Sequence, residues 1–157
     1  MFEPISETAT EALRRYPVEI NDLAHQFYSA LHDHGGFSLD RKGFEPADGH
    51  TVGHAETITL KRDEISILFP TLVGFIADHY ADAIKHPEMI FGGWQNYLTG
   101  TVELDYNRWH ADADTARADG EALQRSVYDV ALMDCLIGQA YPCEVCRLDP
   151  KINTLGA

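Results

Sequence analysis

A Gly-Gly-aromatic sequence occurs twice in this chain, each time shortly after a helical pattern. The two copies lie in HDHGGFSL at residues 32–39 and MIFGGWQN at residues 89–96. Glycine accepts the left-handed backbone that ends a helix, and an aromatic side chain beside it can anchor the next strand in a core. The repeat therefore predicts two similar units, each a helix followed by a strand pair. The expected structural anchors are Gly36, Phe37, Gly93 and Trp94.

Apolar residues recur at helical spacing before each glycine pair. The first stripe runs from Ile20 to Leu31, and the second covers Thr71 to Lys85, with Pro70 suited to the first turn. Apolar and polar residues alternate around residues 37–39, 52–60 and 89–107, which indicates strands. We expect the strands at 37–39 and 52–60 to pair with each other across a long loop.

These patterns predict an α+β fold in a single domain over residues 1–134. Its two helix–hairpin units cover about 20–62 and 70–107, and a closing helix and strand follow in residues 111–134, with Gly120 as a weak point in that helix. We expect a mostly antiparallel sheet of four or five strands with about three helices. Residues 135–157 form a C-terminal extension with a CxxC motif.

Acidic residues outnumber basic ones by 25 to 12, which gives a formal net charge of −13. The excess is spread along the chain, with 13 acids against 6 bases in residues 1–78 and 12 against 6 in residues 79–157. A phosphate backbone or an anionic membrane needs a basic surface, so direct binding to nucleic acid or membrane is not expected. The charge serves solubility, or it presents an acidic surface to a basic protein partner.

The sequence shows no signal for export or membrane insertion. MFEPISETATEALRR lacks the basic segment and apolar stretch of a secretory signal, and ISILFPTLVGFIA is too short to span a bilayer. Three cysteines do not make a disulfide framework. We expect a soluble, cytoplasmic protein.

A family resemblance follows from GGFSLDRKGFEPADGHTVG in the first half and FGGWQNYLTGTVELDYNRW in the second. Over residues 34–134 this Gly-Gly-Phe, Gly-x-Trp, Leu-Asp pattern resembles uncharacterised small accessory proteins of actinobacterial phages and integrated mobile elements. His50 stands where that family has an aromatic residue. The matching positions in the second half are Gly93, Trp94, Leu104, Asp105, Tyr128 and Asp129. The resemblance implies an accessory protein in the cytoplasm of a host cell and implies no activity.

Cys143 and Cys146 have the two-residue gap that zinc knuckles and redox motifs use. A structural zinc site needs four ligands, and Cys135 is the remaining thiol. Three states fit the sequence: reduced thiols with no cofactor, a zinc half-site completed by Cys135 and a histidine or by a second chain, or an oxidised pair.

The eight histidines form no metal-binding motif. His32 and His34 point to different sides of a helix, and His25, His32 and His79 meet only if two helices pack together. His54 beside Glu56 is interpreted as a solvated pair. Because nucleophile and phosphate-binding motifs are also missing, we expect no enzymatic activity.

Six acidic residues in the second half predict a partner-binding surface: Glu103, Asp105, Asp112, Asp114, Asp119 and Glu121. The first hypothesis is a non-enzymatic protein whose acidic surface occupies a basic nucleic-acid channel, as an inhibitor of a host defence nuclease would. The alternative is a small zinc-binding module or metal-dependent enzyme that uses Cys143, Cys146 and histidines. A homodimer formed through residues 71–85 is a third hypothesis.

Overall fold

Helices come first along the chain and alternate with strands after residue 35. The computed structural model describes residues 6–96, 98–125, 127–130 and 134–135. The helices are α1 (Glu7–Arg15), α2 (Pro17–His34), the 3₁₀ helix η1 (Arg62–Ile67), α3 (Leu68–Lys85) and α4 (Ala113–Leu123). The strands are β1 (Gly36–Leu39), β2 (His50–Gly53), β3 (Ile58–Leu60), β4 (Met89–Asn96), β5 (Thr101–His110), β6 (Val127–Asp129) and β7 (Asp134–Cys135).

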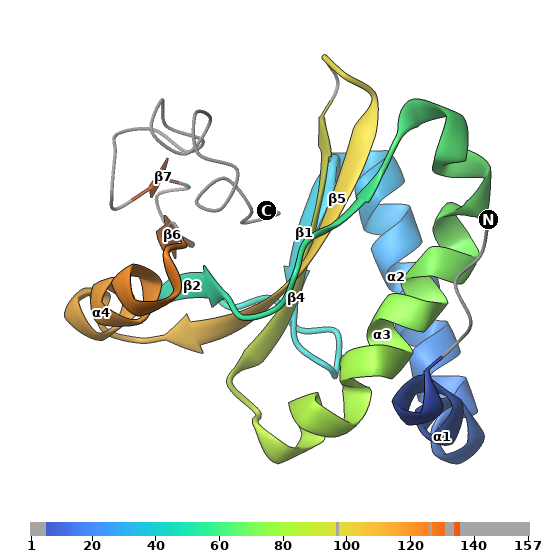
Figure 1. Ribbon diagram of the computed structural model, residues 1–157, viewed down its shortest axis with the longest axis horizontal. Coiled ribbons are helices and arrows are strands. Elements are labelled where there is room, and N and C mark those ends of the chain that lie inside the picture. Colours follow the sequence, from blue (N-terminus) through green and yellow to red (C-terminus); the bar gives the residue numbers. More distant parts are fainter. Residues whose placement is uncertain (1–5, 97, 126, 131–133, 136–157) are drawn as a thin grey trace.

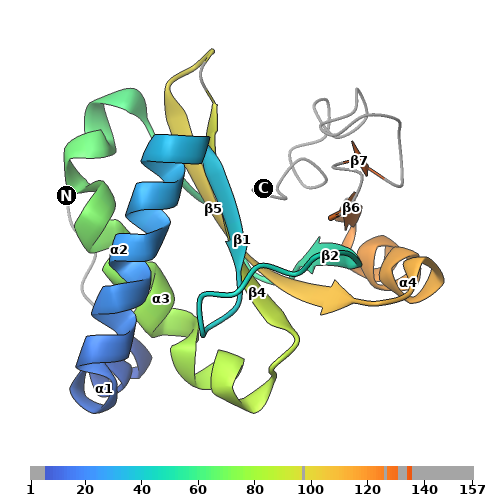
Figure 2. The same ribbon diagram turned by 180° about the vertical axis from the view of Figure 1, so that it is seen from behind.

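One antiparallel sheet contains all seven of these strands: six follow the order β1-β4-β5-β2-β6-β7, and β3 pairs with β5 outside this path. The long strand β5 pairs with β4 along one edge, and along its other edge it pairs with β3 at residues 102–104 and with β2 at residues 107–110. Figure 1 shows α1, α2 and α3 on one side of β1, β4 and β5. The helix α4 lies with β2 and β6 near the C-terminal end of β5, away from these three helices. The reverse view in Figure 2 shows the same separation.

The predicted α+β domain with a mostly antiparallel sheet is confirmed. The structure has more elements than the four or five strands and about three helices expected. Residues 52–60 contribute two strands to one edge of β5 instead of one continuous strand, and β7 adds a short edge strand. The helix α1 has no counterpart in the sequence prediction because its buried residues, Ala9 and Ala12, are too small to give a clear apolar stripe.

The predicted pairing of the first strand with the second is wrong. β1 pairs with β4, and β2 pairs with β5 and β6. The second unit does form the expected β4–β5 hairpin. The two Gly-Gly-aromatic sequences are therefore not equivalent parts of two units. They lie opposite each other in one strand pair, with Gly36 across from Trp94 and Phe37 across from Gly93.

Local signals explain where the helices begin and end. Ser6 caps α1 by accepting a hydrogen bond from the backbone N–H of Ala9 at 3.0 Å, and Pro17 occupies the first turn of α2. Gly35 ends α2 with φ of 76°, as predicted from the first glycine pair. The second pair does not end a helix: α3 ends at Lys85, and Gly92 and Gly93 lie inside β4.

The apolar helix α3 is the central helix of the domain. The stretch Arg62–Lys85 is long and apolar enough to cross a membrane by length and composition alone. In the fold, α3 packs against α1, α2 and β4, and its apolar side chains face the core. The buried ones are Leu68, Leu72, Phe75, Ile76, Ala77, Tyr80 and Ala83. This face is used inside the domain, so a homodimer through residues 71–85 would have to use the partly buried apolar residues of the helix, such as Val73 and Ile84.

Most of the buried apolar residues in the described part of the chain fall into two clusters of unequal size. The main cluster has 22 residues and lies between α1, α2, α3 and the sheet. Its centre is aromatic, with Phe27 stacked on Phe37 at 4.2 Å between ring centroids and Phe91 against Phe75 at 5.5 Å. The second cluster has only Val52, Ala116 and Val127, and it joins α4 to β2 and β6.

Candidate metal centre

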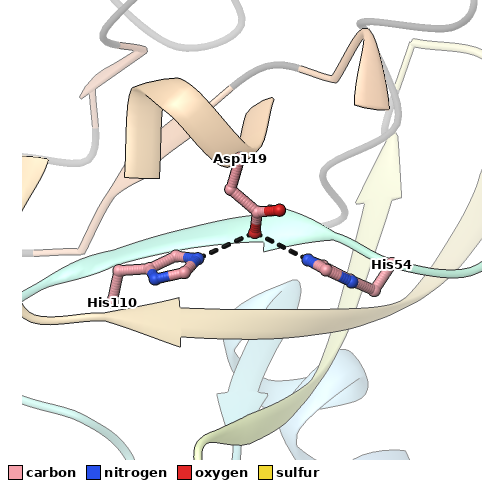
Figure 3. A group of neighbouring side chains, drawn as sticks. All are labelled: His54, His110 and Asp119. Carbon is pink, nitrogen blue, oxygen red and sulfur yellow. Dashed lines mark hydrogen bonds and ion pairs between the residues drawn. The ribbon is translucent and has the colours of Figure 1, made fainter. Parts of the chain in front are cut away.

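Two histidines and one aspartate meet where three segments of the chain come together, with His54 65 residues from Asp119 and His110 nine residues from it. His54 follows the last residue of β2, and its backbone N–H donates to the carbonyl oxygen of Tyr106 in β5 at 2.9 Å. His110 is the last residue of β5, and Asp119 lies on α4. The three side chains point toward one another between the strands and the helix (Figure 3).

The two imidazole rings share a single carboxylate oxygen. Nε2 of His54 lies 2.7 Å from Oδ2 of Asp119, and Nε2 of His110 lies 2.8 Å from the same atom. The three side chains are 14–19% exposed, so the cluster is partly buried and still open to solvent. One potential ligand atom from each residue lies within 4.8 Å of the other two.

Packing of α4 against the strands explains this convergence. Ala116 and Asp119 are three residues apart and lie on one face of the helix, where Ala116 contacts Val52 and Val127. Val52 and His54 are two residues apart, so their side chains leave the same side of the strand. Gly120 lets the helix approach closely, because a Cβ there would lie 2.7 Å from Cγ2 of Val127 and 2.8 Å from the carbonyl oxygen of Arg125.

The charge of Asp119 is stabilised by its neighbours. Burial alone would raise the pKa of this carboxyl group, but the hydrogen bonds from His54 and His110 outweigh burial and lower the pKa below its ordinary value. Asp119 is therefore ionised at neutral pH and can act as an anionic ligand.

Two imidazole nitrogens and one carboxylate oxygen are typical ligands of zinc and of other divalent transition metals. Zinc binds imidazole nitrogen and carboxylate oxygen at about 2.0–2.2 Å, which places tetrahedral ligand atoms about 3.4 Å apart. The Nε2 and Oδ2 atoms here lie 2.7 and 2.8 Å apart, so a small spreading of the side chains would admit an ion. Each imidazole would have to give up its Nε2 proton to become a ligand.

The six predicted partner-binding acids do not form one exposed surface. Asp119 is engaged with the two histidines, and Asp112 caps α4 by accepting a hydrogen bond from the Thr115 backbone N–H at 2.8 Å. Glu103 is half-buried and Asp105 is fully buried. Only Asp112, Asp114 and Glu121 are exposed, and all three lie at or on α4.

Asp105 occupies an unusual position for a carboxyl group. It is 0% exposed and lies on β5, where strand alternation directs it away from α2 and α3. Thr57 Oγ1 donates to its Oδ1 at 2.5 Å, whereas Oδ2 has no hydrogen-bond partner among the described residues. Burial raises the pKa of Asp105 to about 7, although the Thr57 hydrogen bond and the charge of Arg125 oppose this shift.

The remaining predicted residues are dispersed. Phe37 lies in the main core, but Trp94 is half-buried on the opposite face of the sheet, because neighbouring strand residues point to opposite faces. Cys135 lies in β7 opposite Tyr128, and Cys143, Cys146 and the rest of the extension after residue 135 lie outside the described residues.

His25, His32 and His79, which the sequence suggested could meet, do not converge. His25 packs against Phe69 at 4.7 Å between ring centroids, and His79 stacks on Tyr106 at 4.2 Å. His32 contacts the adjacent Asp33 at an exposed position. His54, interpreted as a partner of Glu56, instead contacts Asp119, 65 residues away. No local spacing of residues signalled this cluster.

Comparisons of the chain with protein-family models, with curated proteins and with solved structures find no match.

Proposed function

We propose that this protein binds one divalent transition-metal ion, zinc before others, through His54, His110 and Asp119. The convergence of two imidazole Nε2 atoms on one carboxylate oxygen, from three separate elements, carries this proposal. The partial burial of the three side chains supports it, because a metal site needs both shielding from water and a path for entry.

The ligand set favours zinc over calcium and magnesium. Calcium and magnesium take oxygen ligands, whereas two of the three atoms here are imidazole nitrogens. Copper would bind such a site more tightly in isolation, and metal availability in the cell then decides the occupant. Three protein ligands leave one tetrahedral position for water or for a donor from a partner.

This proposal keeps the zinc-binding alternative of the sequence analysis but assigns different ligands. The three thiols of Cys135, Cys143 and Cys146 are a second set of zinc ligands. Experiments on zinc binding therefore have to distinguish the thiols from the histidine–aspartate cluster. A variant with all three cysteines replaced by serine leaves His54, His110 and Asp119 as the site under test.

Zinc titration of the cysteine-free protein is expected to give one bound ion per chain by calorimetry and elemental analysis. Loss of a residue that only supports a metal ligand weakens metal binding about 10- to 100-fold. His110→Ala and Asp119→Ala each remove a proposed ligand, so each should weaken zinc binding by more than this. His32→Ala is the matched control, because His32 also contacts a carboxylate, at 3.0 Å, but in an exposed pair. It should bind zinc as the parent does.

Cobalt substitution in the full chain distinguishes the two ligand sets. The proposed site gives weak visible bands without the intense near-ultraviolet thiolate band of a cysteine site. If the cysteine-free variant loses the metal and His110→Ala keeps it, the thiolates bind the zinc and the proposal is contradicted. The proposal would also be overturned if neither the full chain nor the cysteine-free variant binds metal.

A second candidate function is binding to a basic protein partner in the cytoplasm of a host cell, as an accessory protein of a phage or mobile element. The net charge of −13 and the exposed acids on α4 favour it. The side chain of Asp114 is 91% exposed. The interacting surface would be the outer side of α4, not all six acids named from sequence.

Affinity capture at about 0.1 M and 0.5 M salt tests this second function, because exposed charge contacts are screened over that range. Asp114→Lys with Glu121→Lys is expected to abolish a capture that occurs at low salt and is lost at high salt. Glu19→Lys with Asp22→Lys makes the same charge change on exposed positions of α2 and should leave capture intact. Equal capture by both double variants would contradict a role for α4.

A further inference from the structure

Among the described residues, the helix α4 and the strand β6 are joined to the rest of the domain by few apolar contacts. Their cluster has three residues, Val52, Ala116 and Val127, against 22 in the main core. None of the three belongs to the main cluster. Figures 1 and 2 show α4 well away from α1, α2 and α3. Within the described part of the chain, apolar burial therefore holds α4 only weakly.

The strand β6 is also paired with β2 in the sheet, and α4 and the residues after it make polar contacts to the segment after β2. Asp119 reaches His54, and the Arg125 guanidinium donates from Nη2 to the carbonyl oxygen of Ala55 at 2.7 Å. Asp119 also contacts His110 at the end of β5. The carboxylate of Asp119 is thus the point at which α4 is fastened to two strands.

We infer that metal bound at His54, His110 and Asp119 latches α4 onto the sheet, so that metal occupancy controls whether residues 112–124 are held in place. This inference rests on the proposed metal site. An ion that requires ligands from β5, from the residue after β2 and from α4 binds only the docked arrangement. Its binding free energy therefore opposes undocking of the helix.

The latch also determines how the exposed acids of α4 are presented. Asp114 and Glu121 lie on the helix that carries Asp119, so a docked helix holds them in one orientation relative to the sheet. Metal release would free the same acids from that orientation without changing their charge. Metal occupancy would thereby regulate the binding of any partner that contacts this helix.

Hydrogen exchange of the full chain, stripped of metal and then titrated with zinc chloride, tests the latch. Without zinc, we expect backbone amides in residues 112–124 to exchange faster than those of α2 and α3. At a zinc concentration about 100 times the Kd, exchange through undocking of α4 should slow about 100-fold. Exchange in α2 and α3 should change little, and a chelator should reverse the effect.

Gly120→Ala gives an independent test that leaves the three ligands intact. The added Cβ would meet Val127 Cγ2 and the Arg125 carbonyl oxygen, so docking of α4 becomes less favourable. This variant should exchange faster in residues 112–124 without zinc and should bind zinc more weakly, because part of the binding free energy is spent on docking. Gly74→Ala, where nothing lies within 4 Å of an added Cβ, is the control and should change neither property.

The outcomes separate the latch from the site itself. One outcome is that the parent protein binds zinc and His110→Ala does not, while zinc leaves hydrogen exchange in residues 112–124 of the parent unchanged. This result would overturn the latch and retain the metal site. Equal slowing throughout the chain would also overturn it, because zinc would then act on global stability. Failure of zinc to bind would remove the proposed site and the latch together.

Discussion

Asp105→Asn is expected to stabilise the protein at pH 8 by up to about 4 kcal/mol. The pKa of Asp105 is about 7 in the folded protein against an ordinary value of 3.8, and each unit of pKa difference corresponds to about 1.4 kcal/mol. Burial causes most of this shift, because the side chain is 0% exposed and its charged form is desolvated. Asparagine keeps the size and the acceptor for Thr57 without the charge.

The pH dependence gives the sign of the effect. The folded protein retains the Asp105 proton to a higher pH than the unfolded chain does, so the favourable contribution is complete below pH 3.8 and is lost as the pH rises to about 7. Denaturant unfolding between pH 4 and pH 8 should show this decline in the parent protein. In Asp105→Asn the component of the slope due to this residue should disappear, and the two proteins should converge near pH 4.

Glu103→Gln is the matched control, because Glu103 lies two residues away on the same face of β5 and is only half-buried. Burial also raises the pKa of Glu103, so its substitution should act in the same direction with a smaller effect. A parent and an Asp105→Asn variant of equal stability at pH 8 would show that the charge of Asp105 is compensated in the fold, contrary to this prediction.

Gly93→Ala is expected to destabilise the protein by about 3 kcal/mol, at the upper end of the usual cost of overpacking a core. A Cβ at this position would overlap the ring of Phe37 at Cε1 and would lie 2.6 Å from Cζ. That ring cannot move aside easily, because it stacks on Phe27 in the main core at 4.2 Å. Chemical denaturation at constant pH measures the loss.

Two comparisons isolate the contact between Gly93 and Phe37. In a Phe37→Ala background the Gly93→Ala change should cost less by about 2 kcal/mol, a coupling within the range found for touching residues. Gly74→Ala in α3 should instead be neutral or stabilising by up to about 1 kcal/mol, because alanine favours helix and the space is open. An equal cost of Gly93→Ala in both backgrounds would mean that the Phe37 ring is not the obstacle.

Elements with strong local periodicity were predictable from sequence. The apolar stripe of α2, its end at Gly35 and the β4–β5 hairpin appear where they were expected. The pairing of β1 was not predictable, because a strand of four residues carries too little pattern to select its partner. The partner was decided by fit: the missing side chain of Gly93 provides the space for the Phe37 ring.

The candidate metal centre was not predictable from sequence for a similar reason. His54, His110 and Asp119 share no motif, and Asp119 was interpreted as one of six surface acids. Only the packing of α4 against β2 separates it from Asp114 and Glu121, which lie on the same helix and remain exposed. Acidic residues on the same helix therefore have different roles, depending on whether their side of the helix faces a strand or the solvent.

The sequence by itself determined the class of fold, the main helices and the acidic character of this protein, because these depend on composition and on contacts between near neighbours. The tertiary structure alone decided the strand order, the burial of Asp105 and the meeting of two histidines with one aspartate. Those features arise when distant segments of the chain pack together, as Thr57 and Asp105 do across 48 residues and His54 and Asp119 across 65. The free energy of such packing depends on shape and burial, which no local pattern of residues records.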